Sequence, residues 1–177
     1  MKLLLLLLLL SYPGKEMLGW TIQKDVPNVV DMNLKGMIRP KVSPSKARHN
    51  VDDSQYTMVI YVDRNDCPSC FVADLAEWEI VMKDCKREKL SLRFMFIFCV
   101  SDPIKPVFMA TLSSSSISDV SYVDTGGIFA KRNPWIKKKE VGHIFLFGKQ
   151  KEPIFMSTPV CVKEIKRTIL AEEYKCA

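Results

Sequence analysis

The sequence is poor in several residue types, and each shortage excludes a class of protein. It holds only two histidines, His49 and His143, among 177 residues, so a histidine-rich metal site is excluded. Seven Gly and ten Pro are too few for a collagen-like or low-complexity chain. Six Cys are too sparse for a disulfide scaffold, although they are enough for specific thiol chemistry.

The sequence also lacks a concentrated basic surface. Its net charge is +6, but the basic residues form small scattered groups at 86–87, 137–139 and 166–167. None of these groups alternates with aromatic residues that could stack on bases, so we expect no nucleic-acid partner and interpret the groups as a solvated face. Hydrophobic residues make up 47% and charged residues 26%, the balance of a globular domain.

The only long apolar run is residues 3–10, eight consecutive Leu that follow Lys2. The run is too short for a membrane-spanning helix, which needs about 20 residues, so we predict no transmembrane span. A positive charge before a short apolar core is typical of a secretory signal peptide, which we place at residues 1–13. The alternatives are a wrongly assigned start and an unusual core segment. A signal peptide predicts a protein that works outside the cytoplasm, where disulfides persist.

The remaining chain predicts an extended arm followed by one α/β domain. Residues 14–53, rich in proline and short apolar pieces, are predicted to form an N-terminal arm and linker, and residues 54–177 a single domain. A helix at 103–116 should begin with Asp102 as its N-cap and Pro103 at its first position. The expected strands are 56–62, 92–100, 120–123, 142–147 and 153–156; the other expected helices are 67–90, a short turn ending at 132, and 162–170.

The chemistry is predicted at Cys67, Pro68, Ser69 and Cys70, between a buried strand and an amphipathic helix. Free backbone N–H groups at a helix start favour a thiolate, the species that attacks disulfides. Cys67 would attack a partner disulfide, and Cys70, one turn further in and shielded, would resolve the mixed disulfide. Asp66 opposes this activation, because a neighbouring carboxylate raises the pKa of a thiol.

Other interpretations of the cysteines remain open. The pair could form a structural disulfide without turnover. A zinc knuckle is disfavoured, because the sequence has no second Cys-x-x-Cys and neither histidine has ligand-like spacing. Cys85 and Cys99 lie in apolar patterns and are expected to be buried as small hydrophobes. Cys161 and Cys176 bracket the predicted last helix, about 20 Å apart, too far to bond to each other.

Residues 56–70 (YTMVIYVDRNDCPSC) resemble the strand and active-site turn of thioredoxin-like proteins. They are especially similar to a signal-bearing, often lipid-anchored group in Gram-negative envelopes, and weaker similarity continues to about residue 170. The resemblance implies a thioredoxin-like fold, with a central mixed sheet flanked by helices. It also implies a dithiol–disulfide oxidoreductase with Cys67 as nucleophile and Cys70 as resolving thiol, no cofactor or metal, and protein thiols or disulfides of the envelope as partners.

Pro68, Ser69 and His143 are the residues expected to face a substrate. His143 falls where thioredoxins carry a cis-proline that pairs with the substrate chain, and Tyr61 stands where they carry a buried carboxylate. His143 is therefore either a polar neighbour of the cysteine pair or a histidine that caps a strand end. The alternative function is a non-catalytic thioredoxin-fold module with a fixed Cys67–Cys70 disulfide, so enzymatic activity is left undecided between the two.

Overall fold

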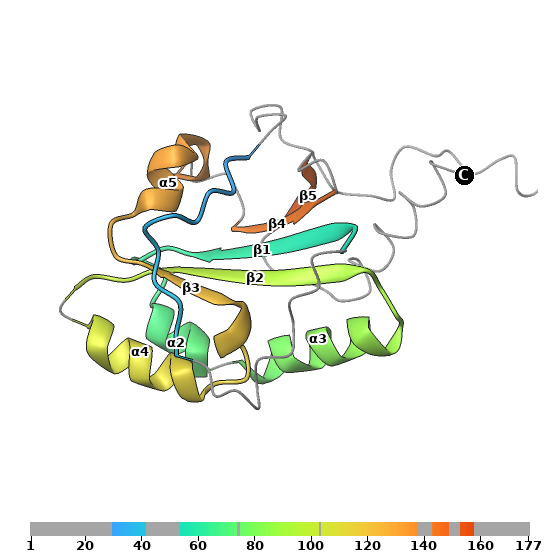
Figure 1. The fold of residues 1–177 in the computed structure, drawn as a ribbon, viewed down its shortest axis with the longest axis horizontal. Helices are drawn as coiled ribbons and strands as arrows, with labels where there is room; N and C mark the ends of the chain where they lie inside the picture. Colours follow the sequence, from blue (N-terminus) through green and yellow to red (C-terminus); the bar gives the residue numbers. More distant parts are fainter. Residues whose placement is uncertain are drawn as a thin grey trace, which may run out of the picture.

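A computed structural model describes residues 30–41, 54–73, 75–102, 104–137, 143–148 and 153–157. The predicted signal peptide, most of the predicted arm and linker, and the predicted last helix with Cys161 and Cys176 lie outside these residues. The described residues make up the α/β domain and the short part of the arm that packs on it (Figure 1).

Five strands form one mixed sheet in the order β3-β2-β1-β4-β5. β1 is parallel to β2 and β2 to β3, whereas β4 and β5 run antiparallel as a hairpin beside β1. All seven residues of the central strand β1 are buried, which explains why its sequence is an apolar run without alternation. This topology confirms the predicted thioredoxin-like sheet. The strands are β1 (Tyr56–Val62), β2 (Leu92–Cys99), β3 (Ser121–Asp124), β4 (Ile144–Phe147) and β5 (Pro153–Ser157).

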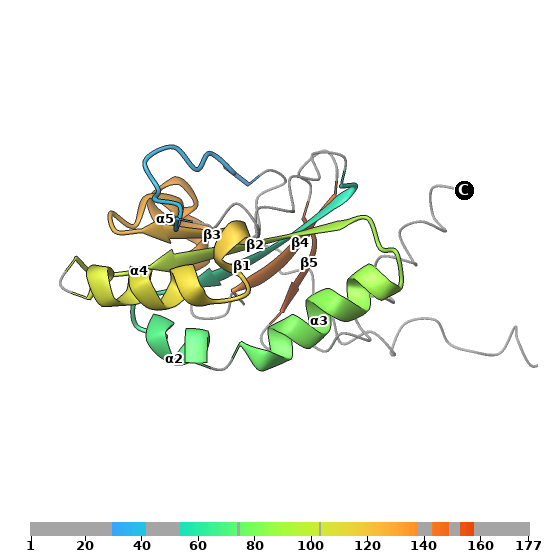
Figure 2. The same ribbon diagram turned by 60° about the horizontal axis from the view of Figure 1, so that its bottom comes forward.

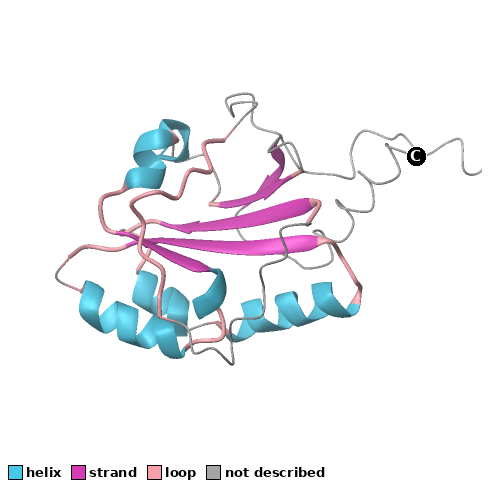
Figure 3. Cartoon of the chain, in the orientation of Figure 1, coloured by secondary structure: helices cyan, strands magenta, loops and turns pink. Residues whose placement is uncertain are grey.

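Helices cover both faces of the sheet (Figures 2 and 3). α2 (Pro68–Ala73), α3 (Ala76–Arg87) and α4 (Lys105–Ser114) lie on one face, and α5 (Ile128–Arg132) lies on the other. Two short 3₁₀ turns, Ser118–Val120 and Pro134–Lys137, complete the described elements.

Two predicted helices have different limits in the structure. The single helix predicted at 67–90 is wrong, because α2 ends at Ala73 and α3 begins at Ala76. The apolar stripe nevertheless runs through both helices, since each turns the same face to the core. The predicted start of α4 is also wrong: Ile104 is the N-cap, and Pro106 occupies the first turn, where a proline breaks no helical hydrogen bond.

The sheet separates two apolar cores. The larger lies under α2, α3 and α4, and the smaller lies under α5 and residues 30–41. This part of the arm turns once at 34–37: Val30 is buried in the smaller core, and Ile38 forms an antiparallel bridge with Val123 of the edge strand β3. The arm thus covers part of an edge that would otherwise expose unpaired backbone groups.

Candidate active site

Cys67 and Cys70 form a disulfide where β1 leads into α2. Their Cα atoms are 5.3 Å apart, a spacing that a disulfide accommodates across one helical turn. Cys67 precedes the helix, and its carbonyl oxygen accepts a hydrogen bond from the N–H of Phe71 at 3.1 Å. Its φ of 52° lies in the left-handed region, which non-glycine residues rarely adopt. Such backbone strain is concentrated at functional sites in proteins.

Both cysteines of the pair are exposed, as is Ser69, whereas Pro68 is buried. The expectation that Cys70 is shielded is wrong. The inward face of α2 begins one residue later, with Phe71 packing on the aromatic rings of β2 and Val72 buried. Cys70 therefore lies on the solvent side of the helix. The substrate contacts expected of Pro68, Ser69 and His143 stay predictions.

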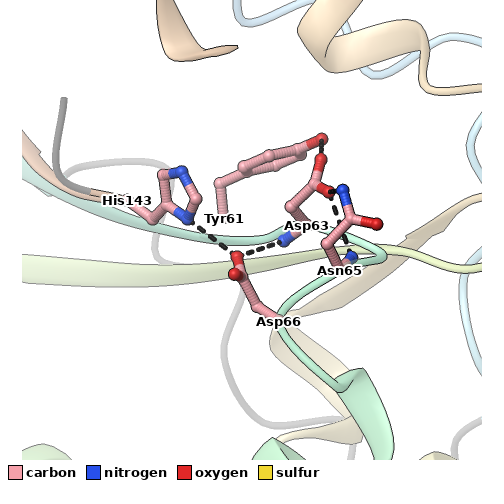
Figure 4. Close-up of polar contacts among 5 residues, drawn as sticks. All are labelled: Tyr61, Asp63, Asn65, Asp66 and His143. Carbon is pink, nitrogen blue, oxygen red and sulfur yellow. Dashed lines mark hydrogen bonds and ion pairs between the residues drawn. The ribbon is translucent and has the colours of Figure 1, made fainter. Parts of the chain in front are cut away.

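A hydrogen-bonded turn, residues 63–66, connects β1 to Cys67. The Oδ1 atom of Asp63 accepts hydrogen bonds from the backbone N–H of Asn65 at 3.1 Å and from its side-chain amide at 2.9 Å. The N–H of Asp66 donates to the carbonyl of Asp63 at 3.0 Å. The Tyr61 hydroxyl donates to Oδ2 of Asp63 at 3.1 Å, which ties the turn to β1 (Figure 4). Residues 63–66 thus form a turn that is closed by its own side chains.

His143, which directly precedes β4, contacts the same turn. Its Nδ1 atom lies 3.0 Å from Oδ2 of Asp66, which also accepts a hydrogen bond from the N–H of Asp63 at 3.2 Å. The Asp66 side chain is 47% exposed and that of His143 31%. The structure therefore places His143 against the residue that precedes Cys67. Sequence reasoning gave Asp66 and His143 separate roles and missed their pairing. The peptide bonds of the described residues, His143 included, are all trans.

A cavity of about 720 Å³ lies next to this pair, on the α5 side of the sheet. Tyr61, His143 and the 63–66 turn form one wall, and the other includes Lys131 of α5. Cys99, at the end of β2, also lines it. Sequence reasoning missed this contribution of Cys99, because it treated the residue only as a buried hydrophobe.

Electrostatic contacts link four of the groups that line the cavity: Tyr61, Asp63, Arg64 and Cys99. An Arg64 Nη atom lies 3.5 Å from the Cys99 sulfur, and this hydrogen bond is the main cause that raises the pKa of Arg64. Burial, followed by the nearby Cys99 and Asp63, raises the pKa of Tyr61 far above its ordinary value. The Tyr61 hydroxyl therefore keeps its proton and acts as a donor.

The two remaining described cysteines are free and buried, as predicted: Cys85 is 3% exposed and Cys99 2%. Burial raises the pKa of Cys85 to about 11, which makes it a poor nucleophile at neutral pH. Within the described ranges, we find no group of three or more histidine, cysteine or acidic side chains placed to hold a metal. Within the same ranges, no helix has the length and apolar character needed to cross a membrane.

No family model matches the sequence, and no curated protein matches it. Solved structures similar to it include StoA from Bacillus subtilis, 16% identical, with 65% of this chain and 82% of that one covered at a TM-score of 0.48. The reduced N-terminal domain of PilB from N. meningitidis is also 16% identical, with 67% and 81% covered and a TM-score of 0.47. A thioredoxin-like protein from Aeropyrum pernix is also 16% identical, and the match covers 67% of this chain and 78% of that one at a TM-score of 0.42.

The chain has a thioredoxin-like fold. This assignment follows from the mixed sheet, its β3-β2-β1-β4-β5 order and the helices on both of its faces. The cysteine pair lies where β1, the central strand, leads into the first helix of the domain, and the pair is joined by a disulfide.

Proposed function

We propose that this chain is an exported thioredoxin-like protein that carries out thiol–disulfide exchange through Cys67, Pro68, Ser69 and Cys70. The observation that carries the proposal is an exposed disulfide across the first turn of α2, beside the hydrogen-bonded 63–66 turn. Exchange requires an attacking thiolate to approach a sulfur atom directly, and exposure of both cysteines permits that approach.

The reaction transfers two electrons from the reduced cysteine pair to a partner disulfide. The Cys67 thiolate attacks one partner sulfur, forms a mixed disulfide with it, and releases the other partner sulfur as a thiolate. Cys70 then loses its proton and attacks the Cys67 sulfur, which frees the second partner thiol and closes the Cys67–Cys70 disulfide. The free N–H groups of the first turn of α2 lie beside Cys67 and favour its thiolate.

The proposed setting is the periplasm or cell envelope. Lys2 and the eight Leu that follow support export of the chain, and the partners would be protein thiols or disulfides in that compartment. No cofactor is needed, because the electrons move between sulfur atoms alone.

A second candidate, a non-catalytic module with a fixed disulfide, is favoured by the chemistry around Tyr61. Thioredoxins carry a buried carboxylate at this position. Here the Tyr61 phenol keeps its proton and donates a hydrogen bond to Asp63. A protonated phenol cannot accept the Cys70 proton. The second step of exchange therefore lacks its usual base, which a fixed disulfide would not need.

The test is the reduction potential of the Cys67–Cys70 pair, measured by equilibration with glutathione, together with an insulin-reduction assay. A potential in the range of exchange-active pairs, with turnover, supports the proposed function. A potential below about −300 mV without turnover supports the fixed disulfide instead. Cys85→Ala is the matched control, because Cys85 is buried in the larger core and should leave both measurements unchanged.

A further inference from the structure

Asp66 directly precedes Cys67, so its negative charge should oppose formation of the Cys67 thiolate. The structure shows this carboxylate engaged in two contacts. Its Oδ2 atom accepts the backbone N–H of Asp63 at 3.2 Å and lies 3.0 Å from Nδ1 of His143 (Figure 4). The second contact supplies the only side-chain partner recorded for this carboxylate within the described residues.

His143 is held firmly enough to act as a support for that carboxylate. Its carbonyl oxygen accepts the N–H of Tyr61 at 2.8 Å, which continues the pairing of β4 with β1. Its ring packs against the Tyr61 ring with centroids 5.7 Å apart and planes at 81°. The imidazole is also 31% exposed, so it can exchange its proton with water.

We propose that His143 is a positioning residue for Cys67: by donating from Nδ1 it holds the Asp66 carboxylate on the β4 side of the turn and, when protonated, offsets its charge. The inference rests on the proposed exchange function and concerns its first step, attack by the Cys67 thiolate. The Cys67 thiolate then forms beside a paired carboxylate instead of an uncompensated one. His143 thereby sets the fraction of Cys67 that is ready to attack.

The other charged groups near the ring are already engaged or belong to the far wall of the cavity. Asp63 accepts hydrogen bonds from Tyr61 and Asn65, Arg64 contacts Cys99, and Lys131 comes from α5. Asp66 is thus the carboxylate that responds to the charge of His143. A charged imidazole offsets the carboxylate and a neutral one does not, so the benefit should fall as the pH rises.

A double-mutant cycle tests the pairing in reduced, full-length Cys70→Ser protein. The measurement is the rate at which iodoacetamide alkylates Cys67, followed on the Cys67 peptide by mass spectrometry. At pH 6 we expect His143→Gln to slow alkylation about three- to tenfold, because Gln retains a donor but carries no charge. We expect Asp66→Asn to speed alkylation by a similar factor, and His143→Gln to change the rate less than about twofold in that background.

The pH profile separates a charge effect from a merely structural one. The ratio of the alkylation rate of the Cys70→Ser parent to that of its His143→Gln variant should fall toward one as the pH rises. An equal slowing by His143→Gln in both backgrounds, or a ratio that does not vary with pH, overturns the inference. Urea unfolding curves of all four proteins, recorded alongside, ensure that the rates compare folded chains.

Alkylation needs no turnover, so failure of the proposed function remains distinguishable. Insulin reduction is measured on the same substitutions with Cys70 retained. Intact coupling between Asp66 and His143 without insulin reduction refutes the exchange function and supports the role of His143. Insulin reduction without coupling refutes the role of His143 alone.

Discussion

Asp124 fastens α5 to the sheet, so its replacement should destabilise one wall of the cavity. Its side chain is fully buried at the end of β3. Oδ1 accepts the N–H of Ile128 and Oδ2 accepts the N–H of Phe129, both at 2.8 Å. These two N–H groups open α5 and have no carbonyl partner within the helix. Asp124→Ala therefore leaves a buried donor at Phe129 and a partly buried donor at Ile128 without their acceptors.

The expected cost follows from the two hydrogen bonds. Leaving a buried donor unsatisfied costs about 1–3 kcal/mol, so Asp124→Ala should lower the free energy of unfolding by about 3–5 kcal/mol. Asp124→Asn keeps one acceptor oxygen and should lose about half as much. Asp102→Ala is the matched control: its partner Lys105 lies 3.9 Å away and its side chain is 79% exposed, so it should cost less than about 1 kcal/mol.

Urea unfolding followed by circular dichroism measures these differences, with the disulfide kept oxidised. The midpoint should fall in the order Asp102→Ala, Asp124→Asn, Asp124→Ala, while the slope with urea stays constant. A loss below about 1 kcal/mol for Asp124→Ala, indistinguishable from the surface control, would refute the claim that this carboxylate holds α5 in place.

The other predictions concern the arm, a buried thiol, the cysteine pair and export. Asn133 is 2% exposed and exchanges two 3.0 Å hydrogen bonds with the backbone of the arm, so Asn133→Ala should cost about 2 kcal/mol and speed proteolysis within 30–41. The raised pKa of Cys85 adds stability that is complete below pH 9 and lost as pH rises through about 11, so the stability difference from Cys85→Ala should change by up to about 3 kcal/mol across that window. Cys70→Ser should accumulate mixed disulfides on non-reducing gels, and Cys67→Ser should abolish exchange; adducts from neither variant would contradict the assigned roles. Mass spectrometry of the native protein should find a new N-terminus between about residues 11 and 20, and an intact Met1 form in the cytoplasm would contradict export.

β1 was predictable from the sequence because its burial is complete. β1 has no polar face, so its apolar run identifies it without any knowledge of its neighbours. The break between α2 and α3 was not predictable in the same way. Phe71, Leu75 and Trp78 keep helical spacing across it, and periodicity alone cannot detect an interruption that preserves the apolar face. The wrong expectation that Cys70 is shielded follows from the prediction of one long helix.

The candidate site was predictable only where it is local. Asp and Asn side chains often hydrogen-bond to the backbone of their own turn, and Asp63 does so with the N–H of Asn65 in the 63–66 turn. The contact between Asp66 and His143 depends on β4 pairing with β1 in the register that sets Ile144 opposite Ile60. Nothing in either local sequence specifies that register, so the pair could not be found before the fold was known.

Tyr61 and His143, which the sequence resemblance aligns with other groups in thioredoxins, both contact the turn before Cys67. Tyr61 bonds to Asp63 and His143 to Asp66, so two neighbouring strands fix the approach to the first cysteine. This arrangement can tune attack by Cys67, but it supplies no base for Cys70. Exposure of Cys70 offers a different route, because an exposed thiol loses its proton directly to water or hydroxide. The resolving step should therefore depend on pH more steeply than the attacking step does.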